Sequence, residues 1–158
     1  MIDLEATKTA QKTSSLLVAF EERWLEPLLR NRVSVVFRKR LPGVPSPDWL
    51  YLYVADPTSA IIGRARVQRY ERMFVNDAIA IAQRGGLTRD ALRDYATAFD
   101  RLSVFTIGPI AESQKPIYLK YLIDVFHFEP PEEFYVLSKE GKAAIDKLGG
   151  WVDEQAQP

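Results

Sequence analysis

The alternation of hydrophobic and polar positions predicts an α+β fold in which strands outnumber helices. Period-two alternation and short apolar runs indicate strands, whereas apolar positions three and four residues apart indicate helices. The predicted strands are 16–20, 33–39, 49–54, 59–69, 102–109 and 134–137. The predicted helices are 21–30, 75–83, 88–99, 116–126 and 139–148.

The order of these elements argues against a doubly wound parallel sheet, because several strands follow one another without an intervening helix. We expect a small mixed or antiparallel β pseudo-barrel of five to six strands flanked by helices. Residues 1–14 are polar and predict a flexible tail, residues 15–138 form the domain, and residues 139–158 add a C-terminal helix and tail.

Glycine, proline and capping residues mark the expected boundaries. Three prolines and a glycine in 41–48 predict a loop. Gly85-Gly86 and Gly149-Gly150 predict helix ends, and Thr88 predicts an N-cap. Gly63, inside a strand, predicts a bulge or a close backbone approach.

A run of three cations ends the second predicted strand. Alternation places Ser34, Val36, Arg38 and Arg40 on one face of this strand, and Lys39 on the other. Two guanidinium groups on one face can hold a phosphate or carboxylate with bidentate geometry. The alternative interpretation is an edge strand that charge protects from aggregation.

Aromatic and basic residues on the next two strands extend this candidate site. Alternation puts Trp49, Tyr51 and Tyr53 on one face of a strand expected beside the arginine strand, where aromatic rings could stack on bases. On the fourth strand, Ile62, Arg64, Arg66 and Gln68 are expected to share one face. The alternatives are core packing for the tyrosines and a solvated face for the arginines. The predicted nucleic-acid-binding set is Ser34, Arg38, Lys39, Arg40, Trp49, Tyr53, Arg64 and Arg66.

Composition adds a charge asymmetry. The 158-residue chain has zero formal net charge, yet residues 30–72 hold nine Lys/Arg against three Asp/Glu, and residues 112–158 hold five against nine. A basic segment in a neutral protein suits a polyanionic partner, and opposite faces also allow self-association. Without a long apolar run or a signal-like N-terminus, we expect a cytoplasmic protein with no membrane partner.

The sequence offers little catalytic or metal chemistry. The chain has no cysteine, which excludes thiol nucleophiles and thiolate metal sites, and its one histidine, His127, is expected to be structural or exposed. Asp48, Asp56 and Glu71 give no sign of converging on a metal. Tyr95 and Phe99 are expected in the core, and Glu132-Glu133 in solvent. Since glycine-rich phosphate loops are absent as well, we expect no cofactor.

In its order and spacing of short motifs, the chain resembles the ASCH domain (activating signal cointegrator homology) of the PUA-like superfamily over about residues 16–138. The segments that carry the resemblance are Val35–Arg40, Leu52–Pro57, Ala60–Gly63, Leu87–Asp90, Phe105–Ile110, Lys115–Leu119 and Pro130–Tyr135. The resemblance implies a pseudo-barrel with a cleft between barrel and helix, and a role with RNA or modified nucleobases. Some relatives are small amidohydrolases of modified nucleosides.

The sequence departs from the family in its second strand. The approximate family motif Gly-x-Lys-x-x-Glu-x-Arg falls on Asn31 to Arg38, so Val33 replaces the lysine and Val36 the glutamate, while Arg38 remains. Ser34 stands where relatives often carry threonine. Because valine supplies neither a base nor a nucleophile, the sequence argues against the amidohydrolase activity.

These observations favour a nucleic-acid-binding module for RNA or a single-stranded or modified base, without catalysis. Two alternatives stay open. One is an enzyme, either a hydrolase of modified nucleosides or a metal-dependent ribonuclease, and the other is a protein-interaction module.

Overall fold

The computed structural model describes residues 12–126 and 133–152 of the chain. The expectations for residues 1–11 of the N-terminal tail, for His127 and for Glu132 lie outside these residues. The predicted tail is wrong for residues 12–14, which begin the first strand. The strands are β1 Lys12–Phe20, β2 Val35–Arg38, β3 Trp49–Val54, β4 Ala60–Phe74, β5 Arg101–Ile107, β6 Ala111–Tyr118 and β7 Phe134–Ser138. The helices are α1 Leu25–Leu29, α2 Val75–Ala80, α3 Arg89–Tyr95, α4 Leu119–Phe126 and α5 Lys139–Gly149, with short 3-10 helices η1 Glu22–Trp24 and η2 Ala82–Gly85.

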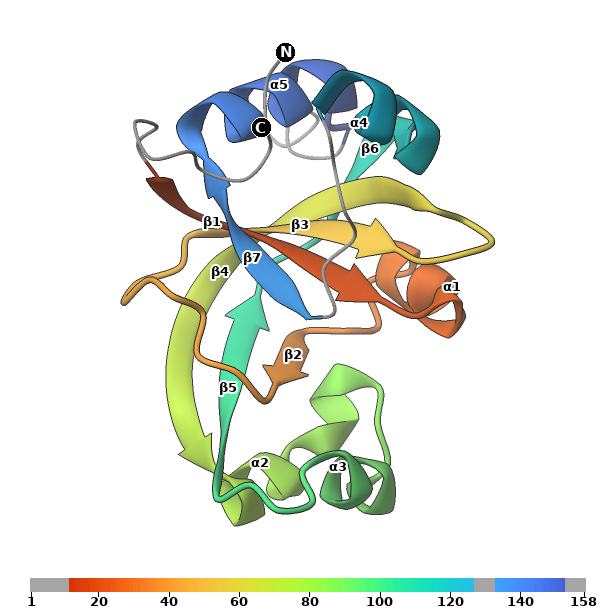
Figure 1. The fold of residues 1–158 in the computed structure, drawn as a ribbon. Coiled ribbons are helices and arrows are strands. Elements are labelled where there is room, and N and C mark those ends of the chain that lie inside the picture. The colour runs from red at the N-terminus through yellow and green to blue at the C-terminus, as the bar shows by residue number, and fades with distance from the viewer. Residues whose placement is uncertain (1–11, 127–132, 153–158) are drawn as a thin grey trace.

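The strands form one mixed sheet that curls without closing. Its order is β2-β5-β4-β3-β1-β7, and β6 pairs with β4. β1 and β3 are parallel, and every other pair is antiparallel. The fifteen-residue strand β4 pairs with β3 and β6 over its first part and with β5 over its second (Figure 1). The predicted α+β pseudo-barrel is confirmed, although the described residues contain seven strands and not five or six.

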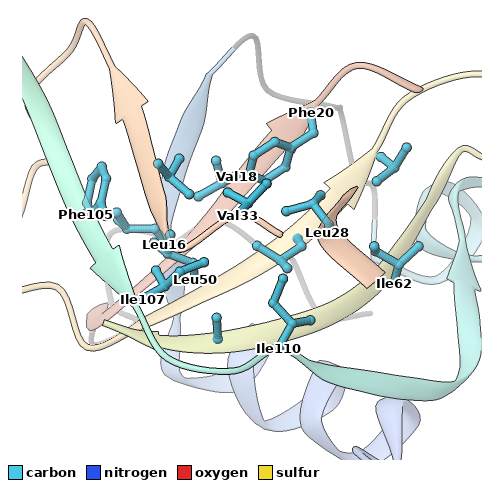
Figure 2. Close-up of a cluster of buried hydrophobic side chains, with 14 residues drawn as sticks. Leu16, Val18, Phe20, Leu28, Val33, Leu50, Ile62, Phe105, Ile107 and Ile110 are labelled. Atoms are coloured by element: carbon cyan, nitrogen blue, oxygen red, sulfur yellow. The ribbon is translucent and has the colours of Figure 1, made fainter. Parts of the chain in front are cut away.

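Three apolar clusters pack against the faces of this curled sheet. The first fills its concave side, where alternate residues of the strands, such as Leu16, Leu50 and Phe105, point toward one another (Figure 2). The second covers the outer face of β1 and β3 beneath α4 and α5, and the third covers β2 and β5 beneath α2 and α3. The two pairs of helices therefore lie at opposite ends of the molecule (Figure 1).

Several boundaries differ from the sequence prediction. β6 was predicted in part as helix, because Pro116 is a common helix starter. Among the described strands, β6 pairs only with β4, so its other edge needs no N–H donor for a sheet and Pro116 is tolerated there. The helix predicted over 21–30 divides into η1 and α1, and the one over 88–99 ends at Tyr95.

The predicted bulge at Gly63 is present and reorients β4. The register with β6 shifts between Ile61 and Gly63, and a Cβ on Gly63 would lie 2.7 Å from the Ala111 carbonyl oxygen. The prediction that Ile62 shares a face with Arg64 is therefore wrong. Ile62 belongs to the first cluster, while the Arg64 guanidinium lies over Trp49 on the other side of the sheet.

The predicted helix signals are confirmed. The Thr88 hydroxyl accepts a hydrogen bond from the Ala91 N–H at 3.0 Å and caps α3. Gly86 follows η2 and Gly150 follows α5, each in the left-handed conformation, with φ of 71° and 54°. The end of η2 and the start of α3 are thus both defined locally, and α3 forms one wall of the site described next.

Candidate nucleic-acid interface

A cleft of about 640 Å³ opens where the ends of β1 and β2 face α3. We call it the basic cleft, because four cationic side chains line it against two carboxylates, Glu21 and Glu133. Its cations are Arg23, Arg38, Lys39 and Arg40, and its aromatic residues are Phe20, Trp24, Phe37, Tyr95 and Phe99. The cleft therefore joins cationic groups to apolar and aromatic walls, the combination that nucleotides require.

The backbone at the cationic end of β2 is held from three sides. The Lys39 N–H donates to Glu133 Oε1 at 3.1 Å. The Lys39 carbonyl accepts from Arg72 Nη1 at 3.0 Å, and the Arg40 carbonyl accepts from the buried Ser103 hydroxyl at 2.6 Å. Because the backbone is fixed, the Lys39 and Arg40 side chains start from defined positions at the cleft.

Arg38 contributes more to structure than the sequence suggested. Its guanidinium donates to the Phe37 and Ala19 carbonyls, both at 2.7 Å, and lies 4.7 Å from the centre of the Phe20 ring. Burial lowers the pKa of Arg38, and Tyr95, Glu133 and Glu21 partly oppose that shift. Arg38 therefore links the ends of β1 and β2 while it lines the cleft.

Lys39 lies against two aromatic rings that the sequence had placed in the core. Its ammonium group is 4.6 Å from the centre of the Tyr95 ring and 5.6 Å from that of Phe99. Tyr95 also donates its hydroxyl hydrogen to Glu133 Oε1 at 2.8 Å. Burial, the largest cause, and the bond to Glu133 raise the pKa of Tyr95, which keeps the hydroxyl protonated as a donor.

Glu133 is, like Tyr95 and Phe99, a site residue that sequence reasoning missed. It was predicted to be solvated, but its side chain is only 17% exposed, and Arg40 Nε lies 3.5 Å from its Oε2. Nothing in the local pattern before β7 distinguishes Glu133 from Glu132, because its donors come from β2 and α3, distant in the chain.

Ser34 does not line the basic cleft. It is exposed, and its hydroxyl donates to the Arg84 carbonyl at 3.3 Å. Of the eight predicted binding residues, the structure therefore brings together Arg38, Lys39 and Arg40 at the cleft.

The other four predicted residues lie elsewhere, since β5 and β4 separate β2 from β3. The expectation that the aromatic strand is next to the arginine strand is therefore wrong. Trp49 and Tyr53 belong to the second cluster beneath α4 and α5, where burial raises the pKa of Tyr53. The guanidiniums of Arg64 and Arg66 lie 4.1 and 4.4 Å from the centre of the Trp49 ring.

Arg64 belongs to a polar cluster that attaches α5 to the sheet. Asp146 Oδ1 accepts from Arg64 Nη1 at 3.0 Å, from the Tyr51 hydroxyl at 2.6 Å and from Trp151 Nε1 at 3.2 Å. Lys142 donates to Oδ2 of the same carboxylate at 2.8 Å. Burial and the bond to Asp146 raise the pKa of Tyr51. Arg64, with a side chain only 13% exposed, is thus not on the solvated face considered from its sequence.

The two family positions that carry valine line the basic cleft. Val33 and Val36 are 5% and 2% exposed, and both belong to the first apolar cluster. Asn31, at the glycine of the family motif, has a φ of 54°. This left-handed conformation suits glycine and asparagine.

The described residues show neither a metal site nor a membrane-spanning helix. In residues 12–126 and 133–152, no three His, Cys, Asp or Glu side chains gather as metal ligands. None of the helices in this part of the chain has the length and apolar character needed to cross a bilayer.

The open mixed sheet, with helices at both ends and a basic cleft beside β2, defines an α+β domain built on a pseudo-barrel that does not close. Comparison with solved structures identifies the fold more specifically. The ASCH protein of Zymomonas mobilis superimposes with a TM-score of 0.78 and 21% identity, covering 89% of this chain and 99% of that one. A serine-to-alanine variant of it gives 0.79 and 21%, covering 87% and 98%.

A more distant match is the N-terminal domain of McrB from Staphylothermus marinus, with a TM-score of 0.55, 12% identity, and coverage of 92% and 99%. No protein-family model and no curated protein matches the chain. The chain therefore has the ASCH-domain fold, which confirms at the level of the fold the resemblance seen in its sequence.

Proposed function

We propose that this protein is a nucleic-acid-binding module whose basic cleft holds an unpaired nucleotide of single-stranded RNA. The observation that carries the proposal is the cationic end of β2, fixed by backbone hydrogen bonds beside aromatic walls. A cleft of about 640 Å³ is also within the range of small-ligand sites, so one nucleotide fits.

The cationic and the apolar parts of the cleft suit the two parts of a nucleotide, its phosphate and its base. Arg40, whose side chain is 69% exposed, and Lys39 offer charge to the phosphate backbone. The aromatic rings and the apolar floor offer stacking and burial to the base. We propose binding without a catalytic step, because Val33 and Val36 supply no base or nucleophile where the family motif has lysine and glutamate.

The first test is fluorescence anisotropy with short labelled RNA and DNA, single- and double-stranded, with and without modified cytosines, at two salt concentrations. We expect single-stranded RNA to bind best and its affinity to fall steeply with salt. Arg40→Ala and Lys39→Ala should each weaken binding by about three- to tenfold and lower the salt slope by about one.

Arg93→Ala is the matched control, since it removes one exposed α3 cation that does not line the cleft and is paired with Asp90. It should leave the affinity and the salt slope nearly unchanged. Arg38→Ala is less informative, because losing its bonds to the Phe37 and Ala19 carbonyls also loosens the fold. Binding that ignores salt, or equal effects of Arg40→Ala and Arg93→Ala, would overturn the proposal. Failure of every oligonucleotide to bind would do so too, and would favour a protein partner.

A further inference from the structure

A carboxylate that lines a cleft proposed to bind a polyanion needs an explanation, because it repels phosphate. Glu133 lines the basic cleft, and two donors of the chain hold its Oε1: the Lys39 N–H at 3.1 Å and the Tyr95 hydroxyl at 2.8 Å. These bonds come from two different elements, β2 and α3, and fix the carboxylate in one orientation.

The second oxygen of Glu133 is less fully bonded. In the described part of the chain, its partner is Arg40 Nε at 3.5 Å, which is long for a hydrogen bond. An ionised carboxylate has about four lone-pair sites, so Oε2 can accept a further N–H from a ligand. It has no hydrogen to donate, and a ligand carbonyl placed against it would be repelled.

Apolar residues of the same cleft increase the energetic difference between a ligand N–H and a ligand carbonyl at Oε2. Val33, Val36 and Phe37 form an apolar part of the same cleft, and a base held there loses water from its polar edge. A base that presents an N–H to Oε2 recovers a charge-assisted hydrogen bond. A base that presents oxygen recovers none.

We propose that Glu133 is the specificity-determining residue of the cleft and selects bases with an exocyclic amino group over uracil. Carboxylates accept from such amino groups, as in the pairing of Glu or Asp with the cytosine amino group. The polar edge of uracil carries two carbonyls beside its one N–H. This inference rests on the proposed function, since it names the class of base that the same cleft takes.

The test compares an oligouridine with versions that carry one central cytosine, adenine or guanine, by competition anisotropy at one salt concentration. The wild type should prefer at least one amino-bearing base over uracil by about tenfold. Glu133→Gln, which keeps the shape and an acceptor for Lys39 and Tyr95 but adds an N–H donor, should reduce this ratio to about twofold or less.

The matched control is Glu21→Gln, which removes the other carboxylate of the cleft. Glu21 is paired with Arg23 on the rim and has a side chain 76% exposed, so its loss should change the affinity for all bases alike. A second variant, Tyr95→Phe, removes one of the two donors that orient Glu133 and leaves the carboxylate and the Lys39 N–H in place, so it should reduce the preference less than Glu133→Gln does. Thermal unfolding of each variant checks that it folds.

The outcomes separate the two proposals. Failure of all these oligonucleotides to bind overturns the proposed function together with this inference. Binding with no difference between uracil and the amino-bearing bases overturns the inference alone. It is also overturned if Glu133→Gln keeps the preference while the protein stays folded, or if Glu21→Gln removes as much of it, because the preference would then not come from the Glu133 carboxylate.

Discussion

Asp146 and Glu133 show how a single carboxylate can organise one region of this small protein. Asp146 accepts from Tyr51, Arg64, Lys142 and Trp151 at the α5 face of the sheet. Glu133 accepts hydrogen bonds at the cleft from the Lys39 N–H at the end of β2 and from the Tyr95 hydroxyl of α3. The first carboxylate is surrounded by groups of the chain and supports structure. The second has, among the described residues, one long contact at its Oε2, the oxygen that we propose for a ligand.

At the residue scale, we predict that Arg64→Ala destabilises the protein. The variant loses an ion pair whose side chains are 13% and 27% exposed, and it leaves Asp146 with a weaker set of donors. The expected loss is about 2–3 kcal/mol in the free energy of unfolding, measured by urea denaturation. Arg66→Ala is the control, since Arg66 also contacts Trp49 but is exposed, and should cost about 1 kcal/mol or less. Equal losses would show that Asp146 does not depend on Arg64.

At the element scale, β4 is the strand that gives the sheet its curvature. It changes partners along its length, from β3 and β6 to β5, and the bulge at Gly63 lies in the first part. Because β4 bends, the first apolar cluster is enclosed on the concave side of the sheet. The second part of β4 pairs with β5, which in turn pairs with β2, the strand that lines the cleft. Gly63 is required there because β6 approaches within contact distance of its Cα.

We predict that Gly63→Ala destabilises the pairing of β4 with β6. The new Cβ would lie 2.7 Å from the Ala111 carbonyl oxygen and 3.1 Å from Ile110, so backbone must shift. A loss of about 2 kcal/mol is expected, with faster amide hydrogen exchange in β6. Gly108→Ala is the control, because its nearest contact is the flexible end of Gln68 at 3.2 Å, and it should cost less than about 1 kcal/mol. Similar losses in the two variants would contradict a special role for Gly63.

For the whole molecule, the C-terminal helix completes the core. Ile145 and Trp151 are 0% and 4% exposed, and they pack in the second cluster with Leu17, Tyr51 and Tyr53. Without α5 and Trp151, this face of the central strands would be in water. The basic cleft lies on β2 and α3, away from α5, so α5 affects binding through the stability of the sheet.

We predict that a chain ending at Ser138 fails to fold. It loses the buried Ile145 and Trp151 and the Asp146 cluster, a loss of roughly 5 kcal/mol or more against a typical domain stability of about 5–15 kcal/mol. Near-ultraviolet circular dichroism and dye binding to exposed apolar surface would report it. A chain ending at Val152 keeps every contact described here and should stay folded. A folded, binding-competent chain ending at Ser138 would contradict the role given to α5.

Local features of this protein were predictable because they depend on neighbours in the sequence. Alternation alone defined β3 and its two faces, with Tyr51 and Tyr53 in the second cluster and Leu50 and Leu52 in the first. Caps and glycines defined the end of η2, the start of α3 and the end of α5. The cationic end of β2 was likewise predictable from the sequence, because three cations follow a short apolar run.

The order of the strands and the partners of the charged groups were decided only by the tertiary structure. Lys39 and Glu133 are 94 residues apart, and Tyr51 and Asp146 are 95 apart, so no local pattern couples them. The alternation of apolar and polar residues also did not predict that β5 and β4 separate the arginine strand from the aromatic strand. The sequence by itself thus determined which residues are apolar, charged or able to cap. Packing in three dimensions decided which cations meet at the cleft, because strand pairing depends on burying the whole apolar surface at once.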